Sequence, residues 1–175
     1  MPVGCAGPTD AGSIRYSYDA DKQTLKLTAQ PQIWSEAAWA QALADRDRIE
    51  AIEGFWIRRP WLLTDACPMP GADQTSASSS SETLGVAQAF AEGGSRVLRR
   101  GRRPYEATVR LDPGVAPTPG AWRLVLKGRL GGGAGGPIRC RLESPDRPPG
   151  CLILVEFDQV AFEAADGAVA AEWPG

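Results

Sequence analysis

Histidine is absent from all 175 residues, and this absence narrows the chemistry open to the chain. Histidine is the commonest general base near neutral pH and the commonest metal ligand in proteins. Catalysis would have to rest on a carboxylate pair, a Ser-Lys pair or a cysteine thiolate. Lysine occurs only at Lys22, Lys26 and Lys127, and the serine run 78–81 lies in no nucleophile motif. We therefore expect a protein that is not an enzyme and that needs no metal or other cofactor.

Long apolar runs and a leader pattern are absent as well. No stretch approaches the roughly 20 apolar residues that span a membrane, and residues 1–4 have neither the charged nor the apolar region of a signal peptide. If the cysteines are oxidised, we expect a leader to have been removed ahead of Met1. Residues 4–7 also look like the end of a bacterial lipobox, which would make Cys5 a lipid anchor, although Pro2 stands where that motif has leucine.

The four cysteines that are present fall as one distant and one close pair. Cys5 and Cys67 lie far apart, whereas Cys140 and Cys151 flank a Pro/Gly-rich turn at 145–150. An even number of cysteines without histidine and without a C-x-x-C motif favours disulfides over zinc or redox chemistry. We expect the bonds Cys5–Cys67 and Cys140–Cys151, and hence a periplasmic or secreted protein. Lipidation of Cys5 is the alternative and would leave Cys67 unpaired.

Charge is unevenly spread along the chain. Residues 1–92 carry 7 Lys/Arg against 12 Asp/Glu, residues 93–150 carry 12 against 4, and residues 151–175 carry none against 5. The basic stretch contains an arginine cluster with no acid inside it: Arg96, Arg99, Arg100, Arg102 and Arg103. Such a cluster is a candidate surface for an acidic protein partner or a polysaccharide. The alternative is a solvated loop whose arginines meet the protein's own acids. Nucleic acid is disfavoured because the whole chain is acidic.

The composition favours a single β-rich domain over 1–175. Glycine and proline number 20 and 15 in a chain that is 43% hydrophobic, which indicates many turns around one core. Residues 13–18 and 24–28 alternate apolar with polar and predict a hairpin. Further strands are expected at 85–90, 96–99, 105–111, 122–127, 138–142 and 151–162. We interpret 85–90 and 96–99 as a second hairpin, with a short helix at 82–91 as the alternative, and the glycine-rich 131–136 as a hairpin tip.

One helix is expected, near 36–47. Ser35 can cap it, and Trp39 and Leu43 lie four apart on the face that would pack on a sheet. The segment 53–64 reads as an aromatic-rich strand that Pro60 places at an edge or a bulge. Residues 68–82 contain almost nothing that can pack and predict a flexible loop.

Five large aromatic residues lie close together in the sequence: Trp34, Trp39, Phe55, Trp56 and Trp61. Large aromatic side chains mostly fill cores, and that is our first interpretation. An exposed row would instead suit stacking on sugar rings, so Trp56 and Trp61 are kept as candidate binding residues. A separate acidic pair, Glu156 and Asp158, is spaced two apart in a strand, about 7 Å by strand rise. That spacing is compatible with a glycosidase pair, but two acids on an outer strand face give the same pattern.

Three strand-like segments resemble the last strands of galactose-binding-like jelly-roll domains. They are 103–111, 122–126 and 153–162, of which the last ends in the pattern apolar-x-Phe-Asp-x-Val-x-apolar at 155–162. The resemblance covers residues 103–162 and implies a jelly-roll-like sandwich; the helix near 36–47 has no counterpart in a plain jelly roll. No binding residue is carried over from it.

These observations together predict an antiparallel β-sandwich or jelly-roll-like fold with one packed helix. The expected function is non-catalytic binding of another macromolecule outside the cytoplasm, for example as a component or inhibitor of a bacterial envelope system. A carbohydrate-binding jelly roll and a histidine-free glycan hydrolase are the alternatives.

Overall fold

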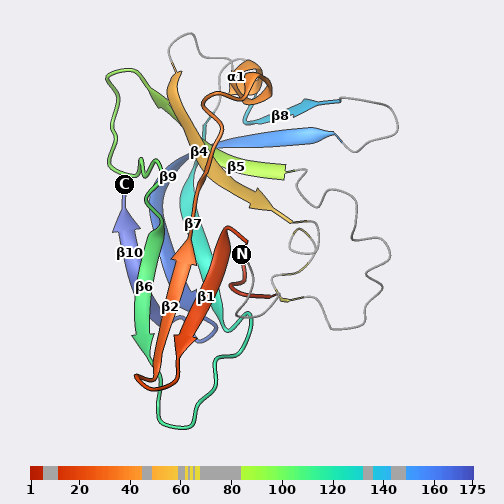
Figure 1. Cartoon of the computed structure of the whole chain (residues 1–175). Helices are drawn as coiled ribbons and strands as arrows, with labels where there is room; N and C mark the ends of the chain where they lie inside the picture. Colours follow the sequence, from red (N-terminus) through yellow and green to blue (C-terminus); the bar gives the residue numbers. More distant parts are fainter. Residues whose placement is uncertain are drawn as a thin grey trace.

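Two sheets pack face to face around the main core. The computed structural model describes residues 1–5, 12–44, 49–58, 62, 64, 66–67, 84–131, 136–142 and 149–175. Of these residues 54% lie in strands and 6% are helical, so the predicted mainly β fold is confirmed and is consistent with a β-sandwich. Figure 1 shows the upright strands of the sandwich below the helix α1.

The smaller sheet has the order β1-β2-β6 and is antiparallel throughout. It contains β1 (Ile14–Asp19), β2 (Thr24–Ala29) and β6 (Tyr105–Arg110). β1 and β2 form the hairpin predicted from their alternation. Leu25 and Leu27 are buried, whereas Lys26 between them is exposed and pairs with Glu106 at 2.7 Å.

The larger sheet is organised around its longest strand, β9 (Gly150–Ala164). Its other strands are β3 (Gln32–Ile33), β4 (Ile49–Ile57), β5 (Leu84–Ala91), β7 (Trp122–Leu130), β8 (Ile138–Arg141) and β10 (Val169–Pro174). The order is β10-β9-β5-β4-β3, and β7 and β8 also pair with β9. The first part of β9 lies beside β5 and β8, and its second part lies beside β7 and β10.

The predicted second hairpin is wrong. β5 is a strand, as expected for 85–90, but 96–99 forms turns within a loop. β5 is paired with β4 along one edge, and β9 pairs in parallel with residues 84–87 on the other edge. The segment 96–99 does not return along β5, because Arg96 and Arg99 pair with Glu50 on β4.

The glycine-rich segment 131–136 is not a hairpin tip, so that prediction is also wrong. β7 and β8 are both antiparallel to β9, and they therefore run in the same direction, one after the other, along it. Gly131 N–H donates to the Leu154 carbonyl and Leu154 N–H donates to the Pro137 carbonyl, so the two strands meet at one residue of β9. Residues 132–135 lie outside the described residues.

The helix begins later than the expected residue 36. α1 spans Ala38–Ala44, while residues 45–48 lie outside the described residues. It begins three residues after Ser35, so the predicted cap is wrong: Ser35 Oγ instead accepts the Ile52 N–H at 3.1 Å and ties this segment to β4. The prediction that Trp39 and Leu43 pack on the sheet is confirmed.

Two hydrophobic clusters fill the molecule. The larger lies between the small sheet and β7, β9 and β10, with Leu27, Leu124 and Phe162 at its centre. The smaller lies under α1 and joins Trp34, Ala40, Ile52, Leu152 and Leu154. Side chains of β4 alternate between the two, because Ile52 belongs to the second and Phe55 to the first.

Gly85 is required by the packing of Trp34. A Cβ at this position would lie 2.9 Å from the indole atom Cη2 of Trp34 and 3.2 Å from Cδ1 of Leu152. The missing side chain therefore lets the Trp34 ring lie directly against β5.

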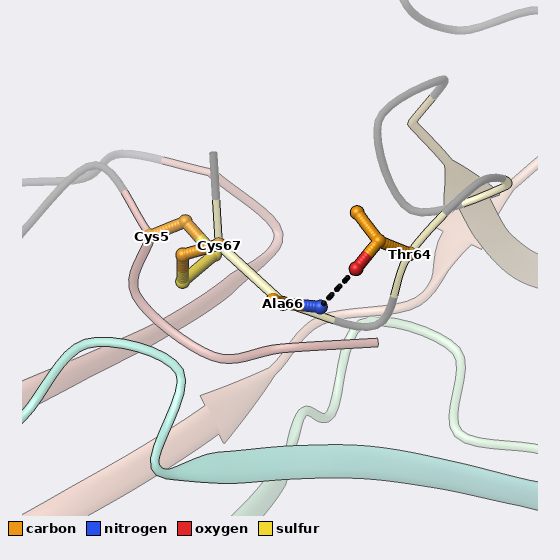
Figure 2. The surroundings of a disulfide bond; sticks show 4 residues. All are labelled: Cys5, Thr64, Ala66 and Cys67. Atoms are coloured by element: carbon orange, nitrogen blue, oxygen red, sulfur yellow. Dashed lines mark hydrogen bonds between the residues drawn. A yellow bond between two sulfur atoms is a disulfide. The ribbon is translucent and has the colours of Figure 1, made fainter. Parts of the chain in front are cut away.

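Both predicted disulfides are formed. Cys140 and Cys151 are directly opposed in the β8–β9 ladder, with Cα atoms 4.0 Å apart. Cys5 and Cys67 join the amino-terminal segment to 66–67 across 62 residues, with Cα atoms 5.2 Å apart (Figure 2). Beside this bond the Ala66 N–H donates to Thr64 Oγ1 at 3.2 Å. The Cys5 sulfur that a lipid would need is thus bonded to Cys67.

Some predictions fall outside the described residues. They concern the flexible loop at 68–82, Pro60 and the binding residue Trp61. The adjoining strand β4 lies between β3 and β5, so it is an interior strand. Among the described residues no helix is long and apolar enough to cross a membrane.

Candidate functional site

All five arginines of the cluster lie on the loop 92–104, which joins β5 to β6 and is called the arginine loop below. Two tight turns fold it: the Arg99 N–H donates to the Arg96 carbonyl and the Arg103 N–H to the Arg100 carbonyl, each at 3.0 Å. Leu98 between them is buried in the main core. The loop is thus held by its own turns and by one apolar anchor.

A buried carboxylate on β4 fixes the middle of this loop. Glu53 is only 5% exposed, and its Oε2 accepts the Arg100 N–H at 2.8 Å. The Gly101 N–H lies 3.0 Å from both carboxylate oxygens. Two successive N–H groups that converge on one anion form a backbone nest, and Gly101 has the positive φ of 58° that this turn needs. The nest of the arginine loop is therefore filled by the protein's own carboxylate.

A second carboxylate on the same strand binds two side chains of the cluster. Arg96 Nη2 and Arg99 Nη1 each lie 2.7 Å from a carboxylate oxygen of Glu50, and Arg99 Nε is 3.8 Å from Glu53. The hydrogen bond from Arg99, aided by the charges of both arginines, lowers the pKa of Glu50 below its usual value. Arg96 and Arg99 thus hold the loop on β4.

This pairing makes a prediction about Glu50. Replacing Arg99 with serine removes the largest cause of the lowered pKa, so the Glu50 carboxyl should titrate at higher pH in Arg99→Ser than in the wild type. Carbon-detected NMR titration of the Glu50 carboxyl measures this. Arg110→Ser, on the far end of β6, is the charge-matched control and should leave the Glu50 titration where it is; an equal rise in both variants would contradict the contact.

Arg100 is also engaged within the protein. Its Nη2 donates to the Pro104 carbonyl at 2.8 Å, and its Cζ lies 4.7 Å from the centre of the Tyr105 ring. The Tyr105 hydroxyl donates to the buried Leu98 carbonyl at 3.1 Å, and burial raises the pKa of Tyr105 to about 12. The phenol therefore keeps its proton, and its hydrogen bond to the loop, throughout the neutral range.

Arg102 and Arg103 differ from the other three. Both side chains are exposed, and within the described part of the chain neither forms an ion pair. Within the described residues, only the guanidinium groups of Arg96 and Arg99 among the five pair with Glu50 and Glu53. The alternative predicted from sequence, that the arginines meet the protein's own acids, describes Arg96 and Arg99 but not Arg102 and Arg103.

The tryptophans near α1 pack on one another. Trp39 and Trp56 stack with ring centres 5.7 Å apart, and Trp34 meets both rings at 5.8 and 5.0 Å. Trp34 is buried, and Trp39 and Trp56 are half-buried. A row of coplanar, outward-facing rings is therefore not formed by these three residues, and the stack belongs to the second hydrophobic cluster.

The acidic pair on β9 fits the interpretation of two acids on an outer strand face. Both side chains are exposed, and Asp158 pairs with Arg129 at 3.1 Å. The ladder with β7 shifts register here, since Lys127 faces Gln159 and Gly128 faces Phe157, which leaves Asp158 as an extra residue. Asp158 therefore lies at a bulge, and both acids are exposed on either side of the buried Phe157. Among the described residues no group of histidine, cysteine and acidic side chains could hold a metal ion.

Comparison with known proteins adds no family. No family model, no curated protein and no solved structure matches this chain. The resemblance of 103–162 to galactose-binding-like domains finds no support there, and the sandwich fold is what the structure establishes. Sequence reasoning missed Glu50 and Glu53 as partners of the arginine cluster. The one available signal was a single acid, Glu53, inside the otherwise apolar run 51–57.

Proposed function

We propose that this protein is a non-catalytic binding domain of the periplasm or the extracellular space, and that the arginine loop recognises an acidic surface of another protein. The two disulfides suggest an oxidising, extracytoplasmic environment. The observation that carries the proposal is that some arginines of the cluster are held by contacts within the protein and others are exposed. Three arginines and a buried carboxylate hold the loop in place, and this fixed loop presents Arg102 and Arg103 to solvent.

Fixing the loop favours binding for a physical reason. A loop that is already ordered loses little conformational entropy when a partner binds, so more of the interaction energy appears as affinity. The positive charge also speeds the encounter with an acidic partner. An adaptable surface loop would show neither the nest around Glu53 nor the buried Leu98.

The two alternatives are less well supported. Sugar binding by stacking requires aromatic faces that are open to a ligand, whereas Trp39 and Trp56 cover one another. Glycan hydrolysis requires two carboxyl groups that converge on the substrate. The exposed pair Glu156 and Asp158 is interrupted by a bulge, and Asp158 is held by Arg129.

The test is a double substitution, Arg102→Ser with Arg103→Ser. The acidic partner, captured from the extracytoplasmic fraction of the native organism by the wild-type chain, should associate with this variant about threefold to tenfold more slowly at physiological salt. The thermal midpoint should stay within about 2 °C of the wild type, because exposed charges contribute little to stability. Association rates by surface plasmon resonance and melting by circular dichroism measure the two effects.

The matched control is Lys22→Ser with Arg110→Ser. It removes the same two charges from the other end of the small sheet, where Lys22 forms an ion pair with the partly exposed Asp19. If both double variants slow association equally, net charge and not the arginine loop is responsible, and the proposed surface is wrong. The same conclusion follows if neither variant slows it.

A further inference from the structure

β8 forms an edge of the larger sheet, and the side chains on its two faces differ in character. The segment 138–142 reads Ile-Arg-Cys-Arg-Leu, so apolar residues alternate with arginines. Ile138 and Leu142 are 54% and 60% exposed, and Arg141 is exposed as well. In a strand, alternate side chains point to opposite faces. One face of this edge is therefore apolar and the other is cationic.

The register with β9 identifies which face is which. Arg139 is opposite Leu152, a residue of the cluster under α1, so the arginines lie on the α1 side of the sheet. Ile138 is opposite Ile153 and Cys140 is opposite Cys151, on the other side. The β9 residue opposite the exposed Arg141 is Gly150, so the β8–β9 ladder places no acid directly beside this arginine.

The backbone N–H and carbonyl groups on the outer side of β8 can accept another strand. The Leu154 N–H bonds to the Pro137 carbonyl, so Pro137 points toward β9. Because alternate residues of an antiparallel strand point to opposite sides, Arg139 also points toward β9 and Ile138 and Cys140 point away from it. Within the described residues no strand pairs with β8 on that outer side.

The disulfide makes this short strand a rigid template. Only four residues of β8 pair with β9, and so short a ladder stabilises a strand weakly. Cys140–Cys151 joins the two strands covalently within that ladder. An edge that is held in its bound geometry loses little entropy when another strand is added.

The same sheet already accepts a short strand beside β7. Pro2 forms an antiparallel bridge with Arg123, the Val3 N–H donates to the Trp122 carbonyl at 2.9 Å, and the Leu124 N–H donates to the Met1 carbonyl at 2.8 Å. β8 continues in the direction of β7 along the same side of β9, and there it has no such cover among the described residues.

We propose that β8 is a docking edge for an extended segment of a partner protein in which acidic and apolar residues alternate. The segment adds as an antiparallel strand and bonds to the outward N–H and carbonyl groups of Ile138 and Cys140. Its acidic side chains lie on the face of the exposed Arg141, and its apolar side chains lie beside Ile138 and Leu142. This surface is separate from the arginine loop, and the proposal does not depend on the function proposed for that loop.

A second copy of this chain is a poorer occupant. Two β8 edges related by a two-fold axis would place residues of the same face opposite one another. Arginine would then face arginine across the new ladder, and directly opposed like charges destabilise a strand pair. The positive charge of Arg141 therefore favours a partner segment of opposite sign.

The test uses a defined peptide, acetyl-Glu-Val-Glu-Val-Glu-Val-amide, and its counterpart with lysine in place of glutamate. We expect the acidic peptide to bind the oxidised protein and to shift the amide resonances of Ile138 and Cys140 in NMR spectra. Arg141→Glu should weaken the acidic peptide about tenfold and should favour the lysine peptide over it. Arg110→Glu changes the net charge equally on the other sheet and should leave the preference for the acidic peptide intact.

Backbone methylation of the acidic peptide separates strand addition from simple charge attraction. Methyl groups on the alternate nitrogens that face β8 should abolish binding, and methyl groups on the other set should not. Equal binding of the two methylated peptides, loss of preference in Arg110→Glu as large as in Arg141→Glu, or no binding of the acidic peptide would overturn the proposal. Resonance shifts confined to the arginine loop would overturn it too, and would leave the function proposed for that loop standing.

Discussion

Glu53→Ala is expected to lower the free energy of unfolding by about 3 kcal/mol. The substitution removes the one buried carboxylate through which β4 contacts the arginine loop. The carboxylate of Glu53 accepts the N–H groups of Arg100 and Gly101 and lies near Arg99. Alanine would leave both N–H groups without their partner in a part-buried site. Urea unfolding followed by tryptophan fluorescence measures the loss.

Two further variants make this expectation specific. Glu53→Gln keeps the shape and one acceptor oxygen, so it should lose less stability than alanine but more than none, because the charge is gone. Glu50→Ala removes a carboxylate from the same strand whose bonds go to partly exposed arginine side chains, and it should cost much less. If Glu50→Ala cost as much as Glu53→Ala, the backbone nest would not be what holds the loop.

Removing the Cys5–Cys67 bond by a double serine substitution is expected to cost about 4 kcal/mol, and removing Cys140–Cys151 about 3 kcal/mol, in the chain-entropy model. The difference arises because the first bond closes a separation of 62 residues and the second a separation of 11. Cys67 also packs on the β6–β7 connection, where a Cβ at Gly120 would lie 2.7 Å from its sulfur.

Guanidinium unfolding of the two double variants, each compared with the oxidised wild type, measures this pair of losses. The Cys140–Cys151 variant is the internal control, because it also removes one disulfide and adds two serines. A larger loss from the short-range bond would mean that native packing around each bond, and not the closure of the loop, sets its contribution.

Local patterns in the sequence predicted the local parts of this fold. The alternation in 13–28 is sufficient for the β1–β2 hairpin, because both strands and their turn are adjacent in the chain. The spacing of the cysteines predicted both disulfides. The order of strands in the larger sheet was not predictable in this way, since residues of β5 pair in parallel with residues of β9 that lie 67 positions later in the chain. Nothing near β5 carries that information.

The candidate site was predicted in part for the same reason. The arginine cluster is visible because its members are neighbours in the sequence. Their division into anchored and exposed side chains depends on Glu50 and Glu53, which are 46 to 49 residues away. A single acid in an apolar strand fits a solvent-facing position equally well. What buries Glu53 is the loop that folds over it, and the alternation of β4 does not show this.

The extra residue in β9, Asp158, lies between the part of the strand that pairs with β5 and β8 and the part that pairs with β10. Phe157 and Val160 both face the main core, although three positions separate them and a regular strand would turn them to opposite faces. Asp158 is the extra residue that brings Val160 back to the face of Phe157. Without it, the chain beyond would present its polar residues inward and Phe162 outward. Asp158, one of the two acids considered for catalysis, therefore shifts the alternation of inward and outward side chains along β9 by one residue.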